Sequence, residues 1–286
     1  MKKHAFIYAV GALCIIGCNM TEIQKVNGVL SATATIEVKT KVDYTDNGAK
    51  KGVTAVWSAD ETFKAYYEGA SEPLVFDKSG AGNSFVANGV PGGVSSETQF
   101  RGLYGKNATL DSNGKIAIDF TGQDGTLDGL SAFDVMTADS KLSEGVLNFA
   151  FKHNCAILRL ECVNHTTKKV SKVKLRFHNV KISEDFSETG ITQAGVFLAL
   201  KFELKSPVAE GSSEYGKGHT ETRYAIVPAM SYQEAKVGLP TSSTTDAFEK
   251  TIELSDSTKS IEAGKVYDVK CEAGLEEAEG GGYWGD

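Results

Sequence analysis

The chain has 286 residues, a length typical of about two domains, with 41% hydrophobic and 23% charged residues. This composition supports packed cores and excludes an extensively disordered chain. The formal net charge of −7 argues against the broad basic surface that a nucleic-acid partner requires.

The first 18 residues have the layout of a lipoprotein signal. Lys2 and Lys3 precede an apolar run of 13 residues, 5–17, which is too short to cross a bilayer. The run ends Ile15-Ile16-Gly17-Cys18, which resembles the lipobox of bacterial lipoproteins. The resemblance implies cleavage between Gly17 and Cys18, a diacylglycerol on the Cys18 sulfur and acylation of the new amino terminus. Because each buried CH₂ contributes ~0.8 kcal/mol, several acyl chains make a durable anchor. The alternative is an ordinary secretory signal with a chance cysteine.

Alternating apolar and polar residues predict β-strands along the rest of the chain. The clearest apolar stripe consists of Leu30, Ala32, Ala34, Ile36 and Val38. Similar runs lie at 116–120, 173–177 and 196–204, and shorter strands are expected at 53–57, 62–67, 98–104, 222–227, 248–254 and 265–271. One apolar and one polar face is typical of antiparallel sheets over a core. No amphipathic helix is evident, so the sequence predicts an all-β protein.

A polar spacer at 139–144, followed by a long apolar run at 146–160, marks an expected domain boundary. We expect a signal peptide at 1–17, a tether at 18–28, an N-terminal β-sandwich at 29–138, a C-terminal β-sandwich at 139–273 and a Gly/Glu-rich tail at 274–286. The apolar parity of the long run changes around Ala156, which indicates either a bulge or burial on both faces. The tail fits a frayed end, or an arm whose Tyr283 and Trp284 dock on a neighbour.

No arrangement of residues predicts catalysis, a metal site or a cofactor. The histidines lack metal-binding spacing, and His153 is expected to be a hydrogen-bonded structural residue. Residues 43–48 resemble a calcium loop only in part, and a hairpin turn is favoured. The acidic turns at 122–125 and 128–129 are expected to be solvated loops. The interpretation is therefore a protein that is not an enzyme.

The cysteines and a group of aromatic residues could each have a structural or a functional role. Three cysteines outside the signal are odd in number and give no disulfide framework, so we expect them to be small buried apolar residues: Cys155, Cys162 and Cys271. Trp57 with Tyr66 and Tyr67 could form a platform on which a sugar stacks, but core and strand-edge positions are favoured.

Four segments, in this order behind a lipobox, resemble the fimbrillin (Mfa-like) family of surface lipoproteins of anaerobic bacteria. They are the stretch around Trp57 and Asp60, the Phe-Asp-Val-Met and Leu-Asn-Phe-Ala-Phe-Lys-His phrases at 133–153, and the strands at 224–228 and 261–267. The resemblance implies two consecutive transthyretin-like Greek-key β-sandwich domains. It also implies a structural or adhesive role in fimbriae (pili) at the cell outer membrane, with other fimbrial subunits and a surface receptor or glycan as partners.

Family members assemble by exchanging strands. A protease removes the first strand, and the terminal strand of the next subunit fills the groove by β-augmentation. By analogy, the removable strand here carries Leu30, Ala32, Ala34, Ile36 and Val38. The family's processing protease cuts after arginine, whereas the first arginine of this chain is Arg101, and the tail has few alternating apolar residues. Both departures favour an anchor, tip or accessory subunit that stays tethered through Cys18. The alternative function is a lipid-anchored surface glycan-binding protein.

Overall fold

The structure, a computed structural model, describes residues 29–36, 45–48, 53–54, 57–58, 60–80, 82–89, 94–164, 172–187, 199–203, 219–240, 247–252 and 259–273. Within these ranges the chain is almost entirely β, and the helical segment assigned there is one short 3₁₀ turn, η1 (Asp128–Ala132). The predicted all-β class is confirmed. No helix in the described ranges has the length and apolar character needed to cross a bilayer.

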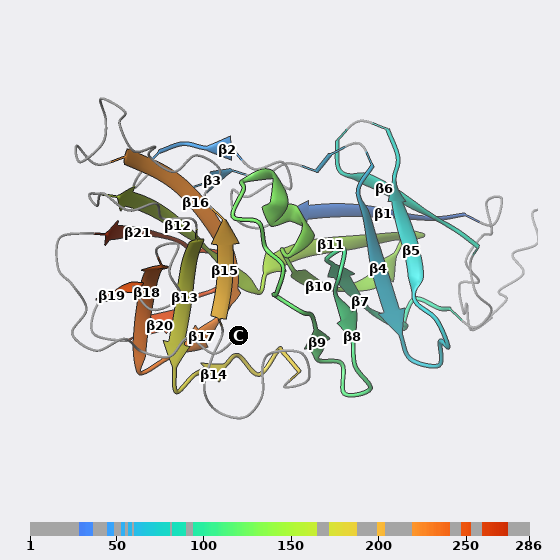
Figure 1. The fold of residues 1–286 in the computed structure, drawn as a ribbon. Coiled ribbons are helices and arrows are strands. Elements are labelled where there is room, and N and C mark those ends of the chain that lie inside the picture. Colours follow the sequence, from blue (N-terminus) through green and yellow to red (C-terminus); the bar gives the residue numbers. More distant parts are fainter. Residues whose placement is uncertain are drawn as a thin grey trace, which may run out of the picture.

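The first group of strands forms one closed sheet (Figure 1). Its hydrogen-bonded order is β1-β11-β10-β7-β4-β5-β6, made from β1 (Val29–Ile36), β4 (Thr62–Tyr67), β5 (Leu74–Lys78), β6 (Ser84–Asn88), β7 (Gln99–Tyr104), β10 (Met136–Ser143) and β11 (Val146–His153). Neighbours are antiparallel except β1 and β11, which run parallel. The sequence led us to expect a sandwich here. The two edges of this sheet meet, because β1 joins β6 to β11.

Phenylalanine rings fill the interior of this barrel. Phe63 stacks on Phe76 with ring centroids 4.9 Å apart, and it meets Phe149 and Phe151 edge to face at 5.0 and 5.1 Å. Room for these rings comes from Gly102 on β7, where an added Cβ would lie 2.9 Å from the Phe149 ring. A large apolar area is thus buried in a small barrel, which is the main source of its stability.

The second group forms layered sheets. One has the order β16-β12-β21, from β12 (Cys155–Asn164), β16 (His219–Pro228) and β21 (Val266–Ala273). The other has the order β15-β13-β18-β19, from β13 (Lys172–His178), β15 (Ala199–Glu203), β18 (Glu234–Pro240) and β19 (Ala247–Ile252). A small third sheet has the order β14-β17-β20, from β14 (Lys181–Ile182), β17 (Met230–Ser231) and β20 (Ser260–Ile261). Residues from all three sheets share one buried cluster, which includes Leu158, Leu175 and Met230.

The chain passes between the two groups at Asn154. The run expected to be one strand is two strands in different sheets, β11 and β12, and this break accounts for the change of apolar parity. The first four residues of β12 are also buried on both faces. The Asn154 N–H donates to the Val135 carbonyl at 2.9 Å, and the Ala229 N–H donates to the Asn154 carbonyl at 3.1 Å. The boundary expected between 138 and 139 falls inside β10, which pairs with β11 and β7 in the first sheet, so the change of sheet comes later in the chain.

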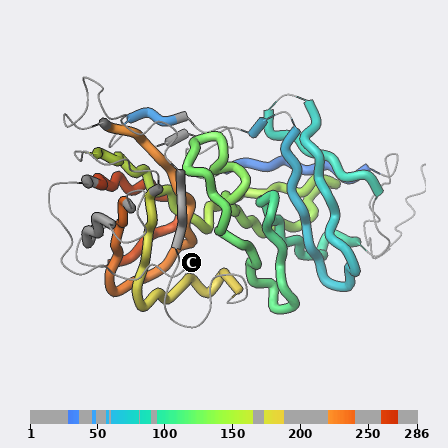
Figure 2. Tube along the Cα trace, in the orientation of Figure 1, coloured from blue at the N-terminus to red at the C-terminus, as the bar shows by residue number. Residues whose placement is uncertain are grey.

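The segment before β10 belongs partly to the second group. The hairpin of β8 (Thr109–Leu110) and β9 (Ile116–Ala117) is followed by residues 118–135, which lie between the two groups (Figure 2). Gln123 reaches the edge of β16, where its side chain accepts from the Ile226 N–H at 2.7 Å and donates to the Ile226 carbonyl at 2.8 Å. The Tyr224 N–H donates to the Gly125 carbonyl at 3.0 Å. These contacts occupy a sheet edge that would otherwise present unpaired groups.

Candidate functional site

The candidate removable strand is strand β1 of the closed sheet. Its side chains alternate as predicted: Leu30, Ala32 and Ala34 are buried, Ile36 is partly buried, and the intervening residues face outward. Val38, the last residue assigned to this strand from the sequence, lies outside the described residues. Gly17 and Cys18, the predicted cleavage and lipidation positions, also lie outside them.

Backbone pairing holds β1 on both sides. It is antiparallel to β6, from Val29 opposite Asn88 to Thr33 opposite Ser84, and parallel to β11, from Ser31 opposite Val146 to Ile36 opposite Phe151. The Ala34 N–H extends the β6 side by donating to the Asn83 carbonyl at 2.9 Å. Because β1 is the link that closes the barrel, its removal would leave both β6 and β11 with an unpaired edge.

The buried face of β1 carries small side chains between large ones. Ala32 lies opposite Phe85 on β6 and Leu147 on β11, and Ala34 lies opposite Phe149. Burying a leucine contributes about 2 kcal/mol and an alanine much less, so the neighbours supply most of the local apolar area. Leu30 adds buried apolar area at one end of the strand, and around Ala32 and Ala34 the strand is held mainly by its two ladders.

Trp57 lies over the end of β1. Its indole N–H donates to the Ala34 carbonyl at 3.2 Å, and its ring meets Phe85, Tyr104 and Phe151 edge to face at 5.4, 5.2 and 5.9 Å. Tyr66 and Tyr67 are partly buried, and Tyr67 contacts Phe100 at 5.3 Å. The three aromatic residues considered for sugar stacking thus pack against the protein itself, as the core and strand-edge prediction required.

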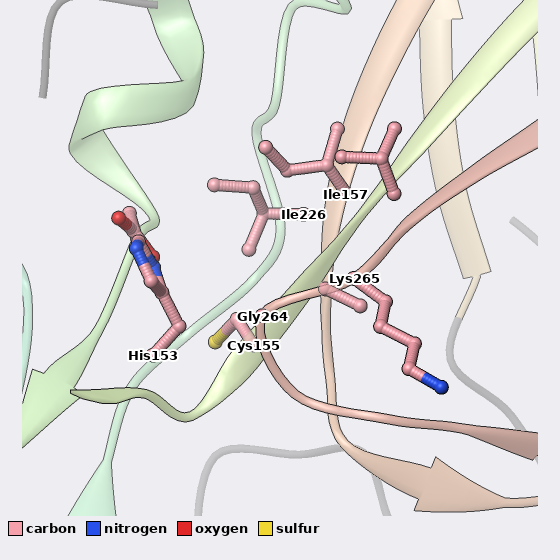
Figure 3. A pocket seen from close by; sticks show the side chains of 9 residues that line it. His153, Cys155, Ile157, Ile226, Gly264 and Lys265 are labelled. Atoms are coloured by element: carbon pink, nitrogen blue, oxygen red, sulfur yellow. The ribbon is translucent and has the colours of Figure 1, made fainter. Parts of the chain in front are cut away.

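His153 is a paired residue of the junction. Its Nδ1 lies 3.0 Å from Asp134 Oδ1, and both side chains are buried. Burial alone would lower the pKa of His153, but the charge and hydrogen bond of Asp134 raise it above its usual value. The pair borders a cavity of about 10 Å³, room for about one water molecule. The Lys265 side chain extends away from this cavity (Figure 3).

The thiols match their predicted role. Cys155, Cys162 and Cys271 are free and buried. Burial raises the pKa of the Cys155 thiol well above its usual value. The neighbouring Cys162 thiol and burial together raise the pKa of Cys271 in the same direction. Thiols in this state are poor nucleophiles.

The acidic turns are organised by hydrogen bonds of their own. Asp124 Oδ1 accepts from the Thr126 N–H and hydroxyl at 2.8 and 2.7 Å. In the 43–48 stretch, the Gly48 N–H donates to Asp46 Oδ1 at 2.8 Å. Thr45 and Asp46 pair antiparallel with Thr54 and Val53, so the predicted hairpin is confirmed for the described residues. The other oxygen of Asp46 contacts Arg159 and Tyr224, which the sequence analysis did not single out. Within the described ranges, no group of three or more histidine, cysteine or acidic residues could hold a metal ion.

The geometry of β1 supports one kind of chemistry, the pairing of extended backbones. An incoming segment would need free N–H and C=O groups on both sides and small or medium apolar residues at alternate positions. At the position of β1, the size of the inward side chains would determine which segment fits, and the two backbone ladders would supply most of the binding strength.

Neither a protein-family model nor a curated protein matches this chain. Solved structures do resemble it. A candidate cell adhesion protein from Bacteroides uniformis is 14% identical with a TM-score of 0.50, covering 87% of this chain and 94% of that chain. A candidate cell adhesion protein from Bacteroides ovatus is 16% identical with a TM-score of 0.49, covering 84% and 91%. The tip fimbrial protein Mfa3 from Porphyromonas gingivalis, truncated at its C-terminus, is 9% identical with a TM-score of 0.38, covering 87% and 96%. Of these three, the Bacteroides uniformis likeness shows a shared fold.

Proposed function

We propose that this chain is a fimbrillin-like cell-surface lipoprotein with a structural or adhesive role in fimbriae, joined to other fimbrial subunits by β-strand addition. The observation that carries the proposal is the position of β1, a strand that buries Leu30, Ala32 and Ala34 and closes an aromatic barrel through two ladders. The fold shared with a candidate cell adhesion protein from Bacteroides uniformis supports it. A structural or adhesive role requires no catalytic site.

The removable strand is β1, and its partner is an extended segment of another subunit. Residues 29–36 present Leu30, Ala32 and Ala34 inward, so the replacing segment carries residues of similar size at every second position. A larger inward residue would meet Phe85, Phe149 or Trp57, which bound this face. The groove thus selects its partner by the size of alternate side chains.

The architecture we propose is two consecutive transthyretin-like β-sandwich domains of Greek-key type. The closed sheet is the first, and the layered sheets from β12 onward are the second, with the division at Asn154, where the chain changes sheet. Strand addition belongs to the first domain because β1 lies there.

Attachment follows from the amino-terminal residues. We propose that lipid on Cys18 anchors the chain in the outer membrane and that residues 18–28 are the tether. The absence of arginine before Arg101 and the composition of the tail favour an anchor, tip or accessory subunit over a polymerising stalk subunit. Such a subunit keeps its lipid while β1 is in place, because a cut after β1 would release Cys18 together with the strand.

The test is the intact mass of the native protein from an outer-membrane fraction, run beside an unboiled gel. A mass equal to residues 18–286 plus acyl chains, in a complex with other fimbrial subunits, is the expected result. A shortened chain without lipid in a heat-resistant ladder would refute the anchor role and leave a stalk subunit. A monomer without lipid and with no subunit partner would refute the fimbrial proposal, and a Cys18→Ala variant serves as the control for lipid mass.

A further inference from the structure

A short hairpin that follows β1 in the sequence lies against the second group of strands. It consists of β2 (Thr45–Asp46) and β3 (Val53–Thr54), paired with Thr45 opposite Thr54 and Asp46 opposite Val53. The preceding strand, β1, belongs to the barrel, whereas β2 and β3 lie beside β16 (Figure 1). The chain is therefore in the first group at Ile36 and beside the second group at Thr45.

Asp46 makes the contact. Its Oδ2 accepts from the Tyr224 hydroxyl at 2.6 Å and from Arg159 Nε at 2.9 Å, while its Oδ1 accepts from the Gly48 N–H at 2.8 Å. Two of these donors belong to the second group, at positions more than a hundred residues away in sequence. Hydrogen bonds to a charged acceptor are stronger than neutral ones, and this carboxylate has three donors.

The two distant donors lie on paired strands of one sheet. Arg159 on the central strand β12 lies directly opposite Tyr224 on β16 and directly opposite Asp268 on β21. Arg159 Nη1 lies 3.4 Å from Asp268 Oδ1, which steadies the guanidinium. The Arg159 side chain is 12% exposed and that of Asp46 is 19% exposed, so water competes weakly for these bonds.

The pKa values of Asp46 and Tyr224 are shifted in the directions expected for an ionised carboxylate bound by a tyrosine hydroxyl. Burial alone would raise the pKa of Asp46, but the hydrogen bonds from Tyr224, Arg159 and Gly48 lower it below its usual value. Burial and the bond to Asp46 raise the pKa of Tyr224 to about 12. Tyr224 therefore stays a hydrogen-bond donor at every physiological pH.

We propose that Arg159 and Tyr224 form a carboxylate-binding site on the second domain and that Asp46, seated in it, makes the β2–β3 hairpin a clasp on the chain behind β1. This inference rests on the proposed function, because it concerns how β1 is released. A cut before the hairpin would free β1 alone. A cut between β2 and β3 would leave β1 joined to β2, and the released fragment would then contact the rest of the protein at two places.

The sequence offers basic residues on both sides of β2. Lys39 and Lys41 precede it, and Lys50 and Lys51 follow it. A fragment with two binding segments leaves more slowly than a fragment with one, because the first segment to detach stays close to its seat. The position of the cut therefore sets how fast the groove opens.

The experiment uses two forms of the full-length protein in detergent. One carries a site for a sequence-specific protease at Lys41, and the other carries the same site at Lys51. After cleavage, loss of the amino-terminal fragment is followed by size-exclusion chromatography in excess synthetic peptide of residues 29–38. We expect the longer fragment to leave on the order of tenfold more slowly than the shorter one.

Three variants locate the cause. Asp46→Asn and Tyr224→Phe should each speed loss of the longer fragment to nearly the rate of the shorter one, and neither should change loss of the shorter. Asp77→Asn, which alters an exposed acid on β5 of the barrel, should change neither rate. Equal rates for the two fragments, or an Asp46→Asn effect on both, would overturn the clasp while leaving β1 exchangeable.

A separate outcome judges the proposed function. If the peptide displaces neither fragment over days, β1 is a permanent strand and the strand-addition proposal is wrong. The carboxylate site is then tested in the uncut protein by a double-mutant cycle of Asp46→Asn and Tyr224→Phe in urea. A coupling of about fivefold or more in the unfolding equilibrium constant supports the site, and additive effects overturn it.

Discussion

The side chains of Asp134 and His153 meet in the junction between the barrel and the layered sheets. Each is almost fully buried, and their separation of 3.0 Å lets the carboxylate hold the imidazole in one orientation. Burial opposes a charged imidazole, but the carboxylate outweighs it and raises the pKa of His153. The protonated ring is thus favoured in the folded chain more than in the unfolded one.

This pair predicts a pH dependence of stability. A folded pKa above the unfolded value means that the contribution is fully present below about pH 6.5 and is lost as pH rises through the folded pKa. We expect urea unfolding between pH 5.5 and 8.5 to show this loss. His153→Gln should remove the slope and cost about 1–3 kcal/mol at pH 5.5. His178→Gln, on the partly exposed His178 of β13, should keep the slope, and a slope retained in His153→Gln would contradict the assignment.

A second prediction concerns Gln123, whose amide acts as a strand partner for Ile226. Gln123→Ala leaves the N–H and C=O of Ile226 without that partner, so we expect a loss of about 2–3 kcal/mol in the free energy of unfolding. Urea denaturation measures it. Gln99→Ala, at an exposed position on β7, is the matched control and should change stability by less than about 0.5 kcal/mol.

The cysteines allow a simple chemical check. Because Cys155, Cys162 and Cys271 are buried, and because burial raises the pKa of the first, we expect alkylation by iodoacetamide to be negligible in the native protein at pH 8. Mass spectrometry after labelling in urea should show all of them modified. Rapid native labelling of Cys155 would mean that the junction opens readily.

At the scale of elements, β1 owes its place to small inward residues. Ala34→Leu would push a larger side chain toward Phe149 and Trp57, and overpacking of this kind costs about 1–3 kcal/mol. Thr35→Leu makes a similar change on the outward face of the same strand and should leave the thermal midpoint nearly unchanged. If the two variants melted alike, β1 would not be held against the aromatic core as described.

The sequence predicts some elements well because their pattern is local. The stripe of Leu30, Ala32 and Ala34 and the strand at 62–67 follow directly from period-2 alternation. Strands β5 and β6 are not predicted from the sequence because each is short, and β5 buries a single side chain, that of Phe76. β18 does alternate, with Ala235, Val237 and Leu239 buried, but the small residues Ala235 and Gly238 and the terminal Pro240 give it a weak strand propensity.

Other features depend on partners far away in sequence. The parallel pairing of β1 with β11, which closes the barrel, has no local signal because it joins residues more than a hundred positions apart. The break at Asn154 is hidden because apolar residues continue on both sides of it. Asp46 likewise has the sequence signal of an ordinary turn residue. Its second role comes from contacts with Arg159 and Tyr224, which are distant in the sequence and give no local signal.

At the scale of the whole molecule, the two groups of strands share structure. The buried cluster of the layered sheets includes Ile118, Phe120 and Val135, all of which precede the crossing at Asn154. Gln123 and Gly125 complete the edge of β16, and the Ile116 N–H donates to the Asp185 carbonyl at 2.8 Å. The second group therefore cannot complete its core without a segment from the first half of the chain.

This sharing predicts that the two groups unfold together. Trp57 reports on the barrel because it contacts Phe85 and Phe151, and labelling of Cys271 reports on the second group because that thiol is buried in β21. In a Trp284→Phe background, Trp57 is the single remaining tryptophan. We expect its fluorescence and the exposure of Cys271 to show one common urea midpoint, as two-state unfolding requires.

Two core substitutions sharpen this prediction. Phe63→Ala empties the barrel core and Phe120→Ala empties the shared cluster, each at a cost of about 3–5 kcal/mol. If the groups are coupled, either substitution lowers the midpoint seen by both probes. If Phe63→Ala lowers the Trp57 midpoint and leaves that of Cys271 in place, the barrel unfolds alone, and the contacts of residues 116–135 are too weak to join the two groups into one cooperative unit. Coupling would also mean that a change in the strand content of the barrel alters the stability of the second group.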